Sequence, residues 1–293
     1  MFRGSIVALV TPFTKKGALD EKTLERLVEF HIKNGTDGIV PCGTTGESAT
    51  LNYAEHERVI DICISVSKKR IPIIAGTGSN STQEAIELSL YAQKAGADGL
   101  LLVSPYYNKP TQKGLYLHFK TIADKVDLPI ILYNIASRTA VNIEPETVAR
   151  LSEDCKNIVA IKEASGSLEQ MARIIALCGK KLTMLSGDDS LTLPLMAIGG
   201  EGIISVVANI IPSDVKAMVV QFCEGNLKEA KRLHYQMLSL VKAMFIETNP
   251  IPVKTAMGLM GLCEPLLRLP MCEMEPGNLA KLKTALKEYG LLK

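Results

Sequence analysis

Residues 95–107 of the chain read AGADGLLLVSPYY, and this stretch contains the pattern that decides the fold. A helical segment ends at Gly96, a short polar turn follows, and an apolar run over residues 99–103 leads into the polar letters SPYY. The same order occurs upstream, where NGTDGIV spans residues 34–40. Gly35 and Gly96 both suit the left-handed backbone position that closes a helix. The repetition indicates units in which a helix is followed by a buried strand.

Eight short aliphatic runs of this kind occur along the chain, at residues 5–10, 38–42, 71–75, 99–103, 129–133, 158–161, 182–185 and 202–207. Each run is rich in Ile, Val and Leu without polar alternation, which is typical of strands that helices bury on both faces. Segments with helical periodicity lie between the runs. Eight alternating units in about 225 residues favour a (β/α)8 TIM barrel over an open doubly wound sheet, which would carry a nucleotide loop at its switch point.

After the eighth run the pattern is purely helical. We therefore predict a (β/α)8 catalytic barrel over residues 1–224 and a small C-terminal helical subdomain over residues 225–293. A break is expected at Asn249-Pro250. The helices expected here span residues 214–223, 227–245, 254–261 and 279–289.

Composition and charge exclude several classes of protein. Hydrophobic residues make up 47% of the 293 residues and the net charge is only +2, with both signs interspersed, so nucleic acid and membrane surfaces are not expected partners. Seven cysteines without a C-x-x-C pair indicate buried thiols in a reducing compartment. The apolar run at residues 6–10 is too short for a signal peptide, and we expect a cytoplasmic protein.

The sequence also lacks the usual signatures of metal and nucleotide sites. Its four histidines lie far apart, without an H-x-H or H-E-x-x-H pattern. Asp188-Asp189 is interpreted as the acidic start of a helix rather than as a Mg²⁺ site. Gly76-Thr77-Gly78 has no third glycine of a dinucleotide loop. We expect neither a metal nor a cofactor.

Lys162 is the main candidate for catalysis. In barrel enzymes the active site forms at the carboxyl ends of the strands, and Lys162 directly follows the run at residues 158–161. Burial disfavours the ammonium form, so the amine becomes a nucleophile able to form a Schiff base with a small 2-keto acid. The alternative is a structural lysine that pairs with Glu163 or another acid at the barrel rim.

Three further features lie at or just after the carboxyl ends of other predicted strands. The turn Gly43-Thr44-Thr45-Gly46-Glu47 could hold a carboxylate on its hydroxyls and N–H groups, or could be an ordinary turn. Tyr133 could transfer protons between the lysine, Thr44 and a substrate oxygen, or simply be hydrogen-bonded at the rim. Arg138 could clamp a second carboxylate, or be a surface residue.

An ordered set of motifs runs through the whole chain and carries a resemblance. The motifs are Gly4-Ser5-Ile6-Val7-Ala8, Thr11-Pro12, the turn at residues 43–48, Ala75-Gly76-Thr77-Gly78, Pro105-Tyr106-Tyr107-Asn108, Tyr133-Asn134, Ser137-Arg138-Thr139, Ile161-Lys162-Glu163, Ser186-Gly187-Asp188-Asp189 and Asn249-Pro250-Ile251-Pro252-Val253-Lys254. On these residues the chain resembles the dihydrodipicolinate synthase (4-hydroxy-tetrahydrodipicolinate synthase) family of pyruvate-dependent class I aldolases.

The resemblance implies a lyase that condenses pyruvate with L-aspartate 4-semialdehyde, the first committed step of diaminopimelate and lysine biosynthesis. Lys162 matches the Schiff-base lysine, and Tyr133, Thr44 and Tyr107 match a proton relay in which the tyrosine at 107 reaches into a neighbouring subunit's site. Four further residues match substrate-binding positions, namely Thr45 and the main chain near Ile204 for pyruvate, Arg138 for the semialdehyde's carboxylate, and Gly187 as a backbone position of the cavity.

The resemblance also implies a homotetramer built as a dimer of dimers, and an L-lysine effector site. That site would comprise Ser48, Ala49, His56, Asn80, Glu84 and Tyr106. The chain departs from the family at Tyr53, where lysine-sensitive members often carry His. It departs again at Ala136 and Ala140, where Pro and Gly are usual around Arg138.

Two other functions fit part of the sequence. One is a related aldolase, such as N-acetylneuraminate lyase or a keto-deoxy-sugar-acid aldolase, which would share Lys162 and Tyr133. The other is a non-catalytic barrel that only binds a keto acid. Arg138 favours the semialdehyde over a polyol, because a polyol needs hydroxyl partners instead. The relay residues favour a catalyst.

Overall fold

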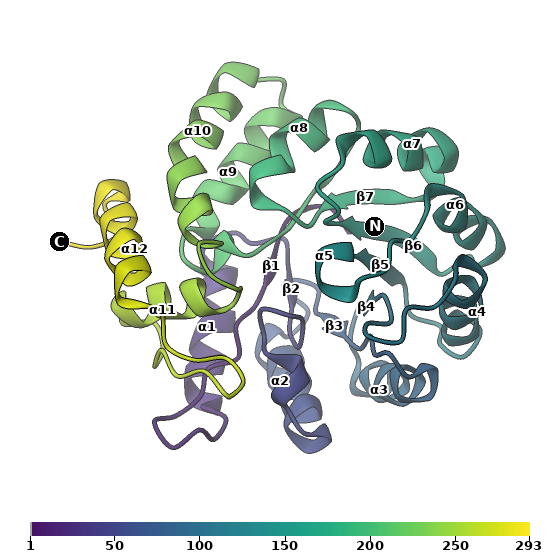
Figure 1. Cartoon of the computed structure of the whole chain (residues 1–293), viewed down its shortest axis with the longest axis horizontal. Coiled ribbons are helices and arrows are strands. Elements are labelled where there is room, and N and C mark those ends of the chain that lie inside the picture. The colour runs from purple at the N-terminus through teal and green to yellow at the C-terminus, as the bar shows by residue number, and fades with distance from the viewer. Residues whose placement is uncertain (1) are drawn as a thin grey trace.

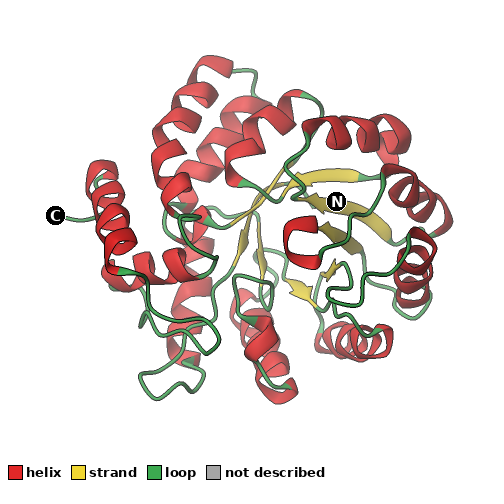
Figure 2. Cartoon of the chain, in the orientation of Figure 1, coloured by secondary structure: helices red, strands yellow, loops and turns green. Residues whose placement is uncertain are grey.

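The computed structural model describes residues 2–293, which form a ring of eight parallel strands surrounded by helices (Figure 1, Figure 2). The strands are β1 Gly4–Ala8, β2 Gly38–Val40, β3 Ile74–Gly76, β4 Gly99–Val103, β5 Ile130–Asn134, β6 Ile158–Glu163, β7 Thr183–Ser186 and β8 Gly202–Ser205. They follow the order β2-β1-β8-β7-β6-β5-β4-β3. A parallel bridge between Ile39 and Ile73 joins the two end strands and closes the ring. The predicted (β/α)8 barrel is confirmed.

One helix follows each strand on the outside of the barrel. These helices are α1 Glu21–Lys33, α2 Tyr53–Ser67, α3 Thr82–Ala95, α4 Gln112–Ala123, α6 Pro145–Asp154, α7 Leu168–Cys178, α8 Thr192–Ala197 and α9 Pro212–Cys223. A short extra helix, α5 Ala136–Thr139, lies in the loop after β5. Gly35 and Gly96 have φ of 75° and 95°, so both adopt the left-handed conformation expected where the chain leaves a helix.

β2 is shorter than the aliphatic run that predicts it, and β3 begins later than its run. Proline explains both changes. β2 ends at Val40, because Pro41 has no N–H to donate and Cys42 turns the chain with φ of 55°. β3 begins only at Ile74, after Pro72. The Pro72 carbonyl still accepts a hydrogen bond from Ile39 N at 3.0 Å, so the barrel remains joined at this point.

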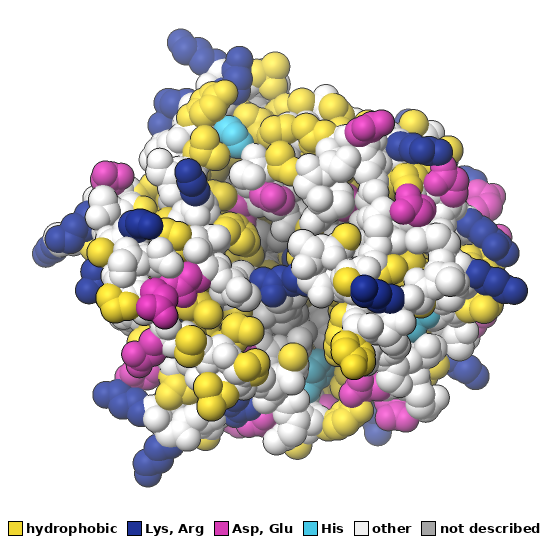
Figure 3. All heavy atoms as spheres, viewed as in Figure 1, with side chains coloured by type: hydrophobic (Ala, Val, Ile, Leu, Met, Phe, Trp, Pro, Cys, Tyr) yellow, Lys and Arg dark blue, Asp and Glu magenta, His cyan; other side chains and the backbone are white. Residues whose placement is uncertain are grey.

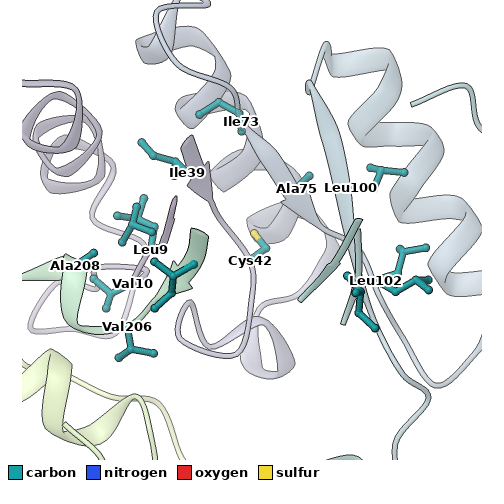
Figure 4. Close-up of a cluster of buried hydrophobic side chains, with 14 of the residues drawn as sticks. Leu9, Val10, Ile39, Cys42, Ile73, Ala75, Leu100, Leu102, Val206 and Ala208 are labelled. Carbon is teal, nitrogen blue, oxygen red and sulfur yellow. The ribbon is translucent and has the colours of Figure 1, made fainter. Parts of the chain in front are cut away.

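Alternate side chains of the strands build two hydrophobic layers. One set points into the barrel and fills it with Ile6, Ala8, Val40, Ile74, Leu101, Ile131, Tyr133, Ala160, Leu185 and Ile204. The other set packs outward against the helices, as Leu9, Ile39, Ala75 and Leu100 do in the cluster of Figure 4. The barrel is thus solid at its centre, and only the loops at its ends are free to form a site.

Three further helices complete the chain: α10 Leu227–Ala243, α11 Ile251–Leu259 and α12 Pro276–Tyr289. α12 packs against α10 and α11, outside the ring of helices (Figure 1). Their buried residues belong to the same hydrophobic cluster as the barrel helices, Val253 and Leu282 among them. The predicted C-terminal helices are therefore present, and the boundary at residue 225 remains a prediction. Within residues 2–293, no helix combines the length and apolarity needed to cross a membrane.

Candidate active site

The strand register brings Lys162 and Tyr133 together inside the barrel. Tyr133 on β5 pairs with Lys162 on β6, and Asn134 pairs with Glu163. Because successive side chains alternate between the two faces of a strand, the first pair points inward with Ile131 and Ala160. The second pair points outward. Lys162 Nζ lies 4.2 Å from the centre of the Tyr133 ring.

The Lys162 side chain is only 5% exposed, and this burial changes its chemistry. Among the residues that the structure describes, the amine has no hydrogen-bond or ion-pair partner. Burial lowers the pKa of Lys162 from 10.5 to about 8, while nearby Asp189 raises it and Arg138 lowers it further. At pH 7 the fraction of free amine therefore rises by roughly 300-fold relative to an ordinary lysine. This is the state that a Schiff-base lysine needs.

Glu163 is not the partner of Lys162, so the alternative of a structural ion pair with this acid is wrong. Its carboxylate lies on the outer side of the strand and accepts hydrogen bonds from Asn134 Nδ2 at 3.0 Å, Gln170 Nε2 at 3.0 Å and Ser165 N at 2.7 Å. These donors satisfy the buried carboxylate without a cation. The network holds β5 and β6 together directly behind the two inward side chains.

Tyr133 is a buried phenol at the same level. Burial raises the pKa of Tyr133 to about 12, whereas Arg138 and the nearby Thr44 hydroxyl oppose this increase. The Tyr133 hydroxyl is therefore protonated at neutral pH and can donate to a substrate oxygen or pass its proton through Thr44. Two of the three expected relay residues thus lie near each other within one chain.

The turn over residues 43–48 presents free N–H groups. Gly46 N and Ser48 N both donate to Gly43 O, at 3.1 and 3.3 Å, and thereby shape the turn. In residues 2–293 no partner is found for the N–H groups of Thr44 and Thr45. Unpaired N–H groups of consecutive residues in a turn form a concave site for an anion. A carboxylate bound there would lie close to Tyr133, since Thr44 lies near this residue.

Gly187 and Ile204 line the interior beside Lys162. A Cβ at Gly187 would come within 2.7 Å of Ala164 Cβ and 3.1 Å of Lys162 Cε, so only glycine leaves room for the lysine chain. Ile204 on β8 is fully buried in the inner layer. Their roles around a bound keto acid remain predictions.

Arg138 lies on α5 and is held by a residue that the sequence analysis did not place in the site. Arg138 NH2 donates to Asn249 O at 3.0 Å, and Asn249 Nδ2 donates to Thr45 Oγ1 at 3.1 Å. Asn249 thus connects the expected binding residues on two different loops. Ala140, which ends α5, has φ of 58° and adopts the left-handed conformation that glycine would take more easily. The short helix nevertheless forms.

Asp188 and Asp189 begin a helical turn, as expected, and Asp189 has a further role. Its neighbour Asp188 caps the turn that begins there, accepting from Ser190 N at 2.9 Å. Asp189 itself is buried and accepts from Ser205 Oγ at 2.5 Å and Val206 N at 3.0 Å. Burial raises the pKa of Asp189, and these hydrogen bonds oppose the increase. Asp189 therefore ties the loop after β7 to the end of β8 and places a carboxyl group near the lysine.

A cavity of about 460 Å³ opens beside the turn at residues 43–48 and is lined by Thr44, Arg138 and Asn249, among other residues. The face of the molecule that carries α5 is visibly hollowed near its middle (Figure 3).

Tyr107 does not reach the cavity. Its side chain is 90% exposed, on a loop where its own φ is 74°. Within one chain, Tyr107 is separate from the two other relay residues.

Five of the six residues expected at an effector site line the same cavity: Ser48, Ala49, His56, Glu84 and Tyr106. The sixth, Asn80, donates from Nδ2 to the Tyr106 carbonyl at 3.2 Å. Tyr53 also lines the cavity, and its hydroxyl donates to Glu84 Oε1 at 2.8 Å. Across residues 2–293, no cluster of three or more His, Cys, Asp or Glu side chains is arranged to hold a metal ion.

Comparison with known proteins gives one family. Residues 1–289 match the model of the dihydrodipicolinate synthetase family. The chain is 60% identical over 292 residues to a 4-hydroxy-tetrahydrodipicolinate synthase from Geobacter sp. (strain M21), and the match covers 100% of both chains.

Two solved structures are similar along their full length. A dihydrodipicolinate synthase from Acinetobacter baumannii complexed with pyruvate is 47% identical, with a TM-score of 0.97 over 100% of both chains. The enzyme from Cyanidioschyzon merolae with lysine bound is 44% identical, with a TM-score of 0.96 over 99% of both chains.

Proposed function

The chain belongs to the dihydrodipicolinate synthetase family, and from that premise we propose that its buried lysine, Lys162, carries the condensation of pyruvate with L-aspartate 4-semialdehyde. The enzyme is a lyase of lysine and diaminopimelate biosynthesis, and the product is 4-hydroxy-tetrahydrodipicolinate. The observation that carries the assignment of Lys162 is its unpaired, buried amine beside Tyr133.

Binding of pyruvate begins at the turn over residues 43–48. Its carboxylate accepts hydrogen bonds from the N–H groups of Thr44 and Thr45 and from the Thr45 hydroxyl. This orientation directs the ketone toward Lys162, with Gly187 and Ile204 forming the wall on the other side. The complex of a relative with pyruvate supports the same ligand here.

Lys162 then attacks the ketone carbon. The amine adds to form a carbinolamine, and loss of water gives an imine in which nitrogen has replaced the ketone oxygen. Tyr133 supplies the proton that leaves with this water, and the relay through Thr44 returns one to it. Loss of a methyl proton converts the imine to an enamine, which is the carbon nucleophile.

The semialdehyde enters last, with its carboxylate on Arg138. The enamine carbon attacks the aldehyde carbon, and the aldehyde oxygen takes a proton to become a hydroxyl. The amino group of the new chain then displaces Lys162 by transimination, which closes the ring and frees the lysine. Arg138 is prepared for this role because Asn249 holds its guanidinium at 3.0 Å.

We propose that the active form contains at least two copies of the chain. Tyr107 is 90% exposed in one chain and lies beside exposed Tyr106 on the same loop. Two consecutive exposed aromatic side chains offer an apolar surface to a partner chain. A neighbouring copy that inserts Tyr107 would complete the relay begun by Tyr133 and Thr44. A homotetramer built from two such dimers is the assembly we propose, in the cytoplasm as the sequence predicts.

The pH dependence of kcat/KM for pyruvate is a direct consequence of the Lys162 pKa. Since the group is protonated and unreactive below its pKa of about 8, kcat/KM is expected to rise about tenfold per pH unit below pH 8 and to level off above it. This parameter reports groups of the free enzyme. A rise that continues to pH 10 would show an ordinary lysine instead.

We propose that L-lysine binds at the effector residues, as it does in a relative. Two groups there suit an ammonium. Glu84 lines the cavity, and within residues 2–293 it has no cationic partner. His56 donates from Nε2 to Gly76 O at 2.9 Å, while its buried Nδ1 has no partner among the described residues. The Tyr53 hydroxyl competes for the same Glu84 carboxylate.

Tyr53→Phe is therefore expected to strengthen inhibition by lysine. Removal of its hydroxyl frees one oxygen of Glu84, so the lysine concentration for half-inhibition should fall about three- to tenfold. Tyr91→Phe is the matched control, because its hydroxyl donates to Asp61 at 2.9 Å away from the cavity. Flat activity across millimolar lysine in both variants would remove the effector site.

One assay tests the proposed function as a whole. The purified protein is supplied with pyruvate and aspartate 4-semialdehyde, and product formation is followed beside cleavage of N-acetylneuraminate. Condensation alone is the expected result. Cleavage of N-acetylneuraminate without condensation would show that the same lysine acts on the rival substrate class instead.

A further inference from the structure

Glu47, the last residue of the motif Gly43-Thr44-Thr45-Gly46-Glu47, is held by the C-terminal part of the chain. Its Oε1 lies 2.5 Å from Lys254 Nζ, and its Oε2 accepts from Arg268 N at 3.0 Å. The Lys254 side chain is 0% exposed, so the pair is fully buried. Burying two charges is costly unless both are well paired, and here both carboxylate oxygens are occupied.

The surroundings of this pair fix it further. Lys254 Nζ lies 4.0 Å from the centre of the Phe13 ring, and the Arg268 guanidinium lies 4.2 Å from the same centre. Arg268 also binds Glu55 at the start of α2, with contacts of 2.5 and 2.7 Å. The segment from α11 to Arg268 is therefore anchored to the loop after β1 and to α2.

Glu47 needs such a support because of its backbone. Its φ of 52° and ψ of 37° lie in the left-handed region, which side chains other than glycine rarely adopt. This conformation turns the chain out of the motif and sets the direction of the residues before it. Two hydrogen bonds to one carboxylate select this conformation over the extended one that glutamate prefers.

A second contact reaches the same turn from the same segment. Asn249 Nδ2 donates to the Thr45 hydroxyl at 3.1 Å. An oxygen that accepts a hydrogen bond from Asn249 directs its own O–H elsewhere, and the remaining direction is toward the free N–H groups of Thr44 and Thr45. The C-terminal segment thus acts on both the backbone and the hydroxyl of the anion site.

We propose that Lys254 and Glu47 are positioning residues, which preset the turn at residues 43–48 to receive the carboxylate of the 2-keto acid. The proposal rests on the proposed function, because it assigns that carboxylate to this turn. It gives the C-terminal helical segment a role in substrate affinity, distinct from a role in holding the barrel together. Lys162 and Tyr133 lie on strands that Lys254 does not touch, so the chemical steps should be less affected than binding.

The experiment compares two variants of the full-length protein. Lys254→Met leaves the Glu47 carboxylate buried without a cation, which should lower Tm and raise the pyruvate concentration for half-maximal borohydride trapping on the order of tenfold, with kcat within about threefold. The double variant Glu47→Gln with Lys254→Met removes both charges at similar volume. It should recover most of the lost Tm. Its requirement for pyruvate should remain raised, because the charge-assisted bond that holds the left-handed turn is still missing.

Lys216→Met is the matched control. Lys216 Nζ lies 2.5 Å from Asp37 Oδ1, a pair at the amino end of β2 and away from the cavity. This variant should leave the pyruvate requirement unchanged. If Lys254→Met is insoluble, the pyruvate requirement of the double variant alone tests the proposal.

Two results would overturn the proposal. One is half-saturation within twofold of the unmodified protein in both variants, and the other is a pyruvate requirement that recovers together with Tm in the double variant. Either would show that the pair only stabilises the fold. Failure of the unmodified protein to trap pyruvate at all would overturn the proposed function and the positioning role together.

Discussion

Replacing Lys162 with methionine is expected to reduce kcat by a factor on the order of 10⁴ or more and to abolish borohydride trapping of pyruvate. The amine is the only atom that can form the imine, so neither the remaining relay nor the carboxylate site can substitute for it. The fold should persist. Methionine has a similar volume, and among residues 2–293 the Lys162 amine has no ion-pair partner to lose.

Lys156→Met is the control for this experiment. Lys156 is exposed and precedes the same strand, β6, at its other end. It should retain full activity and full trapping. Substantial turnover in Lys162→Met, with trapping lost in Lys156→Met, would contradict the assignment of the nucleophile.

The second large effect concerns Tyr133. Tyr133→Phe keeps the ring beside Lys162 but removes the hydroxyl near Thr44. General acid–base catalysis by one group contributes about 10²- to 10⁴-fold, and we expect kcat to fall within this range. Pyruvate should still be trapped on Lys162 at long times, because burial still lowers the pKa of the amine.

The proton step itself can be measured by exchange of the methyl hydrogens of pyruvate with deuterated water. This exchange requires the enamine, and it should slow at least about 100-fold in Tyr133→Phe. Tyr116→Phe provides the comparison, since the Tyr116 hydroxyl donates to Asp154 at 2.7 Å on the outside of the barrel. Exchange at the unmodified rate in Tyr133→Phe would assign the proton transfers to another group.

Local pattern was sufficient to predict the barrel and the burial of Lys162. The run at residues 158–161 is followed by Lys162, and strand alternation then places this lysine on the same face as Ala160, inside the barrel. The same argument places Tyr133 inside. Where local signals failed, the cause was also local, as at Pro41 and Pro72, which shortened two strands.

Contacts between distant parts of the chain could not be predicted in this way. Lys254 meets Glu47 and Asn249 meets Thr45 across more than two hundred positions, as |i−j| values of 207 and 204 show, and no periodicity encodes such pairs. Asp188 and Asp189 begin a helical turn as predicted, but local pattern could not predict that the Asp189 carboxylate also binds the end of β8. The motif containing Asn249 and Lys254 was recognised in the sequence, but its role depended on the folded chain.

Tyr107 shows a different limit. Its position in the chain predicts a relay residue, yet its side chain is exposed in a single chain. Its proposed role depends on a second copy of the chain, which a single sequence does not specify. A specific activity that rises with protein concentration as the chain dimerises would support the proposed sharing of this residue.

The central claim is that Lys162 forms a covalent imine with pyruvate. Pyruvate and borohydride are added together to the protein, which is then digested and examined by mass spectrometry. We expect the peptide containing Lys162 to gain about 72 Da, the mass of a reduced pyruvyl group on an amine. An unmodified Lys162, or the same mass found instead on another lysine such as Lys254, would contradict the account.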